Sequence, residues 1–390
     1  MQAIIIAAGK GTRIYPISLT RPKPLFQLMG QTMIEYTLDQ LQGLATEVIL
    51  VLGYKGEMIQ KRIGNRYKGM RIRYVWQKKQ TGTGSAVTSA LKYIDDKFLL
   101  LMGDDLYSRK DIKNILKKFP AIGAQEVKNP KSFGVITAKN GLMINLAEKP
   151  ERPQSKLANT ALYYFPKTIF KYAISKSARG EYEFTDYVKQ FANDQKLNVY
   201  IAKEWMPIPY VWDFLSVSDM KLGKIKKENK GKLDKGAKIT GKVSVQKGTI
   251  IKSETVINGP AYIGENCILD NCTIHSGTVV ENNCKVGPYS EISHSIIGSG
   301  TTIGEKTIIK DSIIGYNCKI ENNVKFLNRS KLGTVRVIMQ DRLIDTNKKT
   351  LGSFIGDNVL IENNSIIAAG VKIYPKQKIK ANSQILKDAT

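Results

Sequence analysis

The sequence has no hydrophobic run that approaches the roughly 18 to 20 apolar residues of a transmembrane helix, so no membrane span is expected. It is also short of acidic residues, with 34 Asp and Glu against 60 Lys and Arg, a net charge of +26 at pH 7. Such an excess of positive charge is typical of proteins that bind nucleic acid, an anionic membrane surface or anionic small substrates. The lysines are spread along the whole chain, without an arginine-rich cluster or a nucleic-acid-binding motif. We therefore expect a solvated basic surface and no nucleic acid or membrane partner.

The N-terminus leaves no room for a signal peptide, because a glycine-rich stretch begins within the first nine residues. We therefore expect a cytoplasmic protein. The chain of 390 residues is too long for one ordinary core, so two or three domains are expected.

Strand-like and helix-like segments alternate through residues 1–225, which predicts an α/β, Rossmann-like domain with a mostly parallel sheet. The apolar runs at 4–8, 47–52, 71–76 and 97–102 are the expected strands. Helical spacing of apolar residues indicates helices at 32–44, 56–63 and 85–93.

The composition and the periodicity of the sequence change after residue 225. Residues 226–236 are lysine-rich and poor in large apolar residues, which predicts a linker. Over 237–390 an aliphatic residue recurs every six positions, with occasional five-residue steps, and this hexapeptide repeat predicts a parallel β-helix. The expected inward-facing anchors are Ile239, Val245, Ile251, Ile257, Ile263, Ile268, Ile274, Val280, Val286, Ile292, Ile297, Ile303, Ile309, Ile314, Ile320, Phe326, Ile355, Ile361, Ile367, Ile373, Ile379 and Ile385.

Small side chains are expected at the corners, four residues after an anchor. Because all four cysteines occupy this position, burial in the repeat explains them better than a zinc site or disulfides. An excursion at about 329–353 breaks the period and predicts a loop or hairpin that leaves the wall. The corner residues are Thr278, Ser290, Thr301, Thr307, Val359 and Ser365, and the cysteines are Cys267, Cys272, Cys284 and Cys318.

The stretch AAGKGTR, residues 7–13, follows the apolar run of the first strand. It lacks the third glycine of a dinucleotide-binding fingerprint, since Ile14 stands there. It is not a P-loop either, because Lys10 lies between the two glycines. A phosphate loop of another kind and a plain glycine turn both fit these seven residues.

The longer string IIAAGKGTRIYPISLTRPKPL, residues 5–25, resembles the signature of the sugar-1-phosphate nucleotidyltransferases, of the glucose-1-phosphate thymidylyl- or uridylyltransferase kind. Backbone N–H groups of a glycine loop can wrap a triphosphate. The resemblance implies that Arg13 braces the departing pyrophosphate and that Lys23 holds the sugar phosphate and the α-phosphate together. The loop residues implied to bind the nucleotide are Ala8, Gly9, Gly11 and Thr12.

Further motifs follow in the order that the family has them. QKKQTGTG, residues 77–84, resembles the base-recognition loop, with Gln77, Gly82 and Thr83 implied to bind the nucleotide. Asp104 in LMGDD and Asp213 in VWDF match the two magnesium-binding aspartates, and a turn aspartate at a strand end is the alternative for Asp104. The residues implied to bind the sugar 1-phosphate are Gly134, Glu148, Lys149 and Asn159.

The resemblance covers nearly the whole chain, because many members carry a C-terminal left-handed β-helix. It implies transfer of a nucleotidyl group from dTTP or UTP to a sugar 1-phosphate, with glucose 1-phosphate the expected acceptor. Mg²⁺ is the implied cofactor, held by Asp104 and Asp213 with phosphate oxygens and waters. A homotrimer formed through the β-helix is also implied. A non-catalytic regulatory homologue is the alternative, and the presence of Arg13, Lys23, Asp104 and Asp213 argues against it.

A second activity is possible in this architecture, since the chain also resembles archaeal bifunctional nucleotidyltransferase/acetyltransferases, which acetylate an amino-sugar phosphate with acetyl-CoA. That chemistry needs a general base, normally histidine. The chain has only His275 and His294, and neither lies shortly before Asp311-Ser312-Ile313-Ile314, where those relatives have one. We therefore expect a retained scaffold without acetyl transfer.

Overall fold

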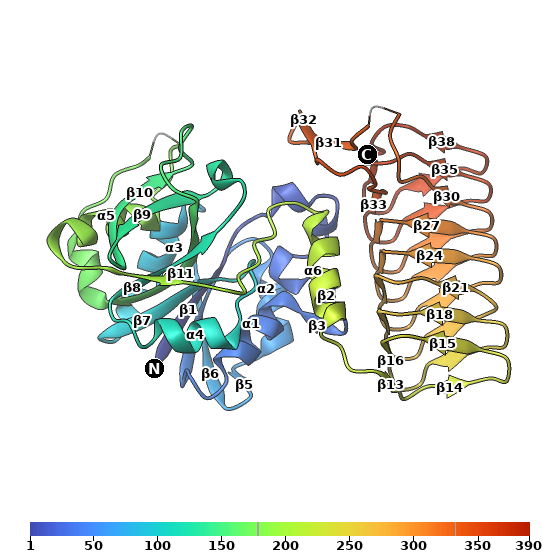
Figure 1. The fold of residues 1–390 in the computed structure, drawn as a ribbon, viewed down its shortest axis with the longest axis horizontal. Helices are drawn as coiled ribbons and strands as arrows, with labels where there is room; N and C mark the ends of the chain where they lie inside the picture. The colour runs from blue at the N-terminus through green and yellow to red at the C-terminus, as the bar shows by residue number, and fades with distance from the viewer. Residues whose placement is uncertain (178, 332) are drawn as a thin grey trace. The chain divides into compact units, whose positions relative to one another are not determined.

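The computed structural model describes residues 1–177, 179–331 and 333–390 (Figure 1). The chain forms two compact units. The first comprises residues 1–10, 22–25 and 32–207, and the second comprises 11–21, 26–31 and 208–390. The division predicted from the sequence, 1–225 and 237–390, stays a prediction, since the compact units separate the chain at other positions.

The first unit is built on a ten-stranded sheet in the order β5-β6-β4-β1-β7-β11-β8-β12-β10-β9. Strands β6 (Met70–Trp76), β4 (Glu47–Leu52), β1 (Gln2–Ala7) and β7 (Lys97–Met102) are mutually parallel. Beyond them β11 (Leu157–Pro166) runs antiparallel to both β7 and β8 (Ala121–Glu126). The expectation of a mostly parallel sheet is therefore wrong, because it came from the first hundred residues, where strands and helices alternate.

The two faces of this sheet carry separate hydrophobic cores. In β1, Ala3, Ile5 and Ala7 contribute to one core, whereas Ile4 and Ile6 contribute to the other. A strand buried on both faces has no polar alternation, which explains why every residue of β1 after Gln2 is apolar. The helices that connect the strands are α1 (Met33–Leu41), α2 (Gly56–Ile63), α3 (Thr83–Ser89), α4 (Arg109–Ile115) and α5 (Phe184–Asp194).

Helix α1 begins where the sequence provides a capping box. The backbone N–H of Glu35 donates to the hydroxyl of Thr32, and the carboxylate of Glu35 accepts from the backbone N–H of Thr32. Two N–H groups that would otherwise lack partners are satisfied in this way. The helix ends at Leu41, three residues before the predicted end at 44.

Most of the second unit is a left-handed parallel β-helix, as predicted. Three parallel sheets of eight short strands each form its walls (Figure 1). The sheet that begins with β13 (Glu228–Asn229) is called wall 1; it continues through β16 (Val243–Val245), β19 (Ala261–Ile263), β22 (Thr278–Val280), β25 (Ile296–Ile297), β28 (Ile313–Ile314), β33 (Phe354–Ile355) and β36 (Lys372–Ile373).

The predicted anchors line the interior, with one correction. Leu269, and not Ile268, faces the core between Ile251 and Val286. The five-residue step therefore separates Leu269 from Ile274. Two adjacent aliphatic residues satisfy the repeat equally well, so the pattern alone could not place the short turn.

The four cysteines are buried and free, as expected for small core residues. The corner residues are also buried; for example, the hydroxyl of Thr301 donates to the carbonyl of Gly315 at 2.9 Å. Hydrogen bonds of this kind satisfy a polar group inside an otherwise apolar coil.

The β-helix begins earlier than the sequence indicates. Glu228–Asn229 (β13) and Lys232–Leu233 (β14) lie in the predicted linker, yet they pair with β16 and with β17 (Ile250–Ile251). A terminal coil has a neighbour on one side only, so it needs fewer apolar residues and gives a weaker pattern.

The predicted excursion contains a hairpin, β31 (Arg336–Met339) and β32 (Arg342–Asp345); residue 332 lies outside the described residues. Within the described ranges, no helix is long and apolar enough to cross a membrane.

Candidate active site

Predicted site residues of the first unit gather where its parallel strands end. Ala8 follows β1, Gln77 follows β6, and Asp104 comes two residues after β7. Ligands of α/β sheets bind at the carboxyl ends of the strands. The strand order, with β1 between β4 and β7, brings these ends to one edge of the sheet.

Lys23 and Asp104 form the clearest pair in this group. The ammonium of Lys23 lies 2.9 Å from Oδ2 of Asp104. The lysine side chain is 7% exposed and the aspartate side chain 40% exposed, so the carboxylate keeps an open side. An ammonium buried next to one partly accessible carboxylate is suited to receive a further anion such as a phosphate.

The glycine loop connects the two units. Ala8 and Gly9 belong to the first unit, and Gly11, Thr12 and Arg13 belong to the second. A Cβ at Gly9 would meet no protein atom within 4 Å, so protein packing does not require glycine there. Gly11 has φ of +63°, a conformation that glycine adopts without strain. Arg13 is exposed in the short 3₁₀ helix Thr12–Ile14.

The predicted base-recognition residues lie together. Nε2 of Gln77 donates to the carbonyl of Gly82 at 3.0 Å and to Oγ of Ser85 at 2.8 Å. Gly82 has φ of +111°, and a Cβ there would collide with the backbone of Tyr182. Thr83 begins α3, and its hydroxyl accepts from the backbone N–H of Phe184 at 2.9 Å. The loop is therefore held in place by α5 and by the segment before it.

Three of the four predicted sugar-binding residues, Gly134, Glu148 and Asn159, lie close together. Gly134 begins β9 (Gly134–Lys139) and pairs in register with Glu148, the last residue of β10 (Leu142–Glu148). A Cβ at Gly134 would lie 3.1 Å from Oε2 of Glu148 and 3.4 Å from the Cβ of Asn159. Nδ2 of Asn159 donates to the hydroxyl of Tyr163 at 2.7 Å.

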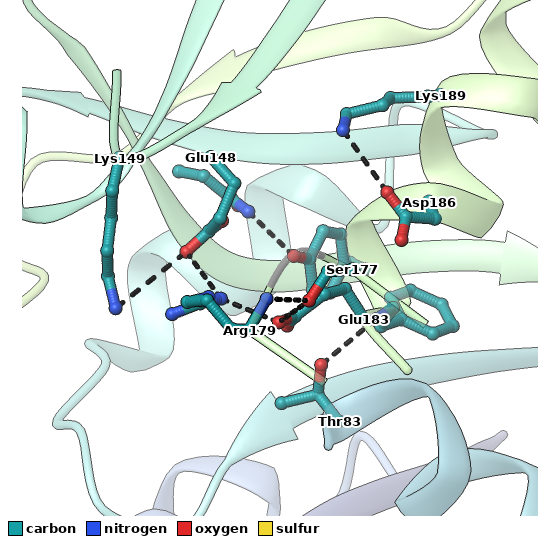
Figure 2. Close-up of polar contacts among 11 residues, drawn as sticks. Thr83, Glu148, Lys149, Ser177, Arg179, Glu183, Asp186 and Lys189 are labelled. Carbon is teal, nitrogen blue, oxygen red and sulfur yellow. Dashed lines mark hydrogen bonds and ion pairs between the residues drawn. The ribbon is translucent and has the colours of Figure 1, made fainter. Parts of the chain in front are cut away.

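The fourth predicted residue, Lys149, has its ammonium 4.0 Å from Oε1 of Glu148. Sequence reasoning missed Arg179, which bridges two carboxylates in Figure 2. Its Nη2 atom lies 3.3 Å from Oε1 of Glu148 and 2.6 Å from Oε1 of Glu183. Burial raises the pKa of Glu183, and the charge of Arg179 opposes that rise. Nothing in the sequence distinguishes Arg179 from the other basic residues.

The two predicted magnesium ligands belong to different units, Asp104 to the first and Asp213 to the second. Asp213 is the first residue of α6 (Asp213–Gly223), and its Oδ2 accepts from the backbone N–H of Tyr210 at 2.8 Å. No group of three or more His, Cys, Asp or Glu side chains that could hold a metal occurs in the described part of the chain. Mg²⁺ is suited to a site with only one or two protein carboxylates, because it keeps waters and substrate phosphates as its other ligands.

The histidines have different surroundings. His294 lies between two carboxylates, with Nδ1 2.5 Å from Asp311 and Nε2 3.1 Å from Asp219. These hydrogen bonds, to Asp219 first and then Asp311, raise the pKa of His294 to about 9. It is therefore protonated at neutral pH, with both ring nitrogens in use, which is unsuitable for a general base. His275 is partly exposed, with Nε2 3.9 Å from Glu291.

A glycine loop and a lysine–aspartate pair at the ends of parallel strands are the features of an α/β enzyme that handles phosphates. The chain belongs to the nucleotidyl transferase family, whose sequence profile matches residues 2–221. A second profile, that of the GMPPB C-terminal domain, matches residues 257–385. The resemblance seen in the sequence is thereby confirmed.

Curated relatives match the full length of the chain. A protein from Methanocaldococcus jannaschii named bifunctional protein GlmU is 35% identical, over all of this chain and 95% of that protein. A bifunctional sugar-1-phosphate nucleotidylyltransferase/acetyltransferase from Sulfurisphaera tokodaii is 32% identical, over all of this chain and 98% of that protein.

Among solved structures, a candidate glucose-1-phosphate thymidylyltransferase from Bacillus anthracis, in complex with sucrose, superposes with a TM-score of 0.53. The two sequences are 24% identical, and the match covers 59% of this chain and 98% of that one. At this identity the likeness supports the fold only.

Proposed function

We propose that this protein transfers a uridylyl or thymidylyl group from UTP or dTTP to a sugar 1-phosphate, with glucose 1-phosphate the expected acceptor. The observation that carries the proposal is the buried Lys23 ammonium, 2.9 Å from Asp104 at the strand ends and close in sequence to the glycine loop. Relatives with this architecture include a protein named as a sugar-1-phosphate nucleotidylyltransferase/acetyltransferase.

The proposed reaction is a direct displacement. An oxygen of the sugar phosphate attacks the α-phosphorus, a new P–O bond forms, and the bond to the β-phosphate breaks as pyrophosphate leaves. Lys23 holds the two reacting phosphates together and neutralises their repulsion. Arg13 carries a guanidinium fork that can receive the leaving pyrophosphate. Catalysis by such groups consists of positioning and charge stabilisation.

Mg²⁺ fits the proposal through the carboxylates of Asp104 and Asp213. When bound, the ion would supply positive charge against the triphosphate oxygens. Asp104 has an open side for this role, since 40% of its side chain is exposed beside Lys23.

Substrate choice is proposed to rest on two groups of residues. Gln77, Gly82 and Thr83 would recognise the pyrimidine, with the amide of Gln77 oriented by Gly82 and Ser85. Gly134, Glu148, Lys149 and Asn159 would recognise the sugar 1-phosphate. The convergence of Gly134, Glu148 and Asn159 supports that assignment. The expected homotrimer is part of the same proposal, and the mass of the protein in solution tests it.

The decisive experiment is a grid of UTP, dTTP, ATP and GTP against glucose 1-phosphate, N-acetylglucosamine 1-phosphate and mannose 1-phosphate, with Mg²⁺ present. We expect pyrophosphate release with a pyrimidine triphosphate and glucose 1-phosphate, and its loss when EDTA is added. Release with purines alone would refute the base assignment. No release in any combination would favour the non-catalytic alternative.

Acetyl transfer is the second candidate function, because relatives matched over the full length are named bifunctional. The surroundings of His294 argue against it, since two carboxylates hold that ring protonated. We expect no thiol release from acetyl-CoA with glucosamine 1-phosphate, followed with a thiol reagent at pH 7.5. Robust release that disappears in His275→Ala or His294→Ala would contradict this expectation and make the protein bifunctional.

A further inference from the structure

The outer surface of wall 1 is unlike that of an exposed solenoid. Residues that precede the inward anchors point away from the core, because side chains alternate along a strand. On the second sheet such positions are exposed, as at Lys285, Thr302 and Lys319. From β16 to β36 of wall 1 the equivalent residues are at most 8% exposed, and all but the polar Ser244 and Lys372 are apolar or aromatic: Ser244, Tyr262, Val279, Ile296, Ile313, Phe354 and Lys372. Wall 1 is therefore a buried surface on both sides.

Residues 11–21 cover part of the outer surface of wall 1. They form the second half of the glycine loop and its continuation, and they belong to the same compact unit as the β-helix. Arg21 is 5% exposed, forms an ion pair with Asp357, and stacks over Tyr316 with Cζ 3.4 Å from the ring centroid. The hydroxyl of Thr20 donates to the same carboxylate at 2.5 Å. The other oxygen of Asp357 accepts from the backbone N–H of Tyr316 at 2.8 Å.

Residues 26–31, which follow the signature, are held by a second carboxylate of the β-helix. Glu281 is fully buried and accepts from the backbone N–H groups of Met29 at 2.5 Å and Gly30 at 2.9 Å. Nε2 of Gln27 donates to it at 3.1 Å. Three donors directed at one buried carboxylate fix the backbone of this segment.

The hairpin that interrupts the β-helix adds a contact to the glycine loop at Thr12. Nε2 of Gln340, in the turn between β31 and β32, donates to the hydroxyl of Thr12 at 2.6 Å. The hairpin is itself tied to wall 1, because the buried ammonium of Lys372 donates to the carbonyl of Ile338. Thr12 is adjacent to Arg13, so this contact is one residue from the proposed pyrophosphate ligand.

Helix α6 is fastened to the same surface. Asp219 of α6 bonds to His294, which is in turn bonded to Asp311. Trp212 lies beside Phe354 of wall 1, with ring centroids 6.3 Å apart. The first residue of α6 is Asp213. Wall 1 and the turns that adjoin it thus hold residues 11–21, which include Arg13, and residues 26–31. These two segments lie on either side of Lys23 in the chain. The same surface holds helix α6, which begins at Asp213.

We infer that wall 1 is a positioning surface for nucleotidyl transfer, and that Asp357 and Glu281 are positioning residues for a reaction they do not touch. The inference rests on the function proposed above. Lys23 lies two residues after Arg21 and three before Phe26, so a chain anchored on both sides fixes where its ammonium can reach. Phosphoryl chemistry that depends on positioning loses on the order of 10²-fold in rate for a displacement near 1 Å.

The test uses full-length Asp357→Asn, with Asp357→Glu as the conservative variant and Asp270→Asn as the matched control. Asp270 is also a β-helix aspartate in an ion pair, 2.7 Å from Lys252, but in the described interactions it contacts neither residues 11–21 nor residues 26–31. Hydrogen–deuterium exchange is followed in peptides of residues 11–31 and of the β-helix, together with kcat and KM for pyrophosphate release.

We expect Asp357→Asn to speed exchange in residues 11–31 alone and to lower kcat by about 10²-fold. Asp357→Glu should recover part of both, and Asp270→Asn should match the wild type. A general folding defect would instead speed exchange throughout the β-helix. If Asp357→Asn does not fold, Thr20→Val, which removes one hydrogen bond to Asp357 without changing the side-chain shape, should give the same changes to a smaller degree.

Two results would overturn the inference: exchange of residues 11–31 as slow as in the wild type, or faster exchange with an unaltered kcat. Absence of pyrophosphate release by the wild-type protein would instead refute the proposed function. In that case the exchange measurement still decides whether wall 1 holds residues 11–31 in place.

Discussion

Asp104→Asn is expected to lower kcat/KM for pyrophosphate release by about 10²- to 10³-fold, the range seen when one group that stabilises transition-state charge is lost. Asparagine keeps the shape and can still accept from Lys23, whose ammonium lies 2.9 Å from Oδ2 of Asp104. The substitution therefore removes the negative charge and leaves the local geometry. Steady-state pyrophosphate release at saturating Mg²⁺ measures the effect.

Asp105→Asn is the matched control, because it makes the same chemical change in the next residue. Asp105 accepts from the indole N–H of Trp205 at 2.9 Å, a bond that an asparagine oxygen can also accept. We expect this variant to keep activity within a few-fold of the wild type, since a preserved neutral acceptor costs little. Undiminished activity in Asp104→Asn, or equal losses in both variants, would contradict the role given to Asp104.

Phe326→Ala is expected to lower the free energy of unfolding of the β-helix by about 3 to 5 kcal/mol, the usual cost of truncating a buried phenylalanine. Phe326 takes the place that an aliphatic residue has in the other coils, and it is 2% exposed. Its removal leaves a cavity next to Ile367, its partner in the following coil. Urea unfolding followed by circular dichroism measures the shift.

The neighbouring residue provides the control for that change. Leu327 is 46% exposed, and Leu327→Ala should alter the free energy of unfolding by no more than about 0.5 kcal/mol. A loss in Phe326→Ala as small as in Leu327→Ala would mean that the coil closes around the missing ring. Because a solenoid is stabilised by contacts between neighbouring coils, the effect is expected near the substituted coil.

The sequence predicted local structure well where one physical pattern dominated. The limits of β4, α2 and β7 agree with the expected segments, because each has a strong apolar period between clear turns. The β-helix anchors also agree, except where Ile268 and Leu269 compete for one position. There the decision depends on the length of a turn, which an aliphatic pattern does not encode.

The site was predictable only to the extent that motifs carry it. The motifs brought Lys23 and Asp104 into one group, and the structure places their charged atoms in contact. Arg179 was missed because its contacts with Glu148 and Glu183 depend on the fold of distant strands. The hydrogen bonds of Arg21 to Asp357 and of Met29 to Glu281 were missed for the same reason, since each joins residues more than 250 positions apart.

The number of coils in the β-helix also fixes the distance between Glu281 and Asp357. Glu281 follows β22 and Asp357 follows β33, and these strands are separated along wall 1 by β25 and β28. Three steps of about 4.8 Å each set roughly 14 Å between the two attachment levels. Removing one complete coil between them would keep the hydrophobic period intact but shorten that span by a third. Insertions and deletions that a solenoid usually tolerates should therefore be poorly tolerated between residues 281 and 357.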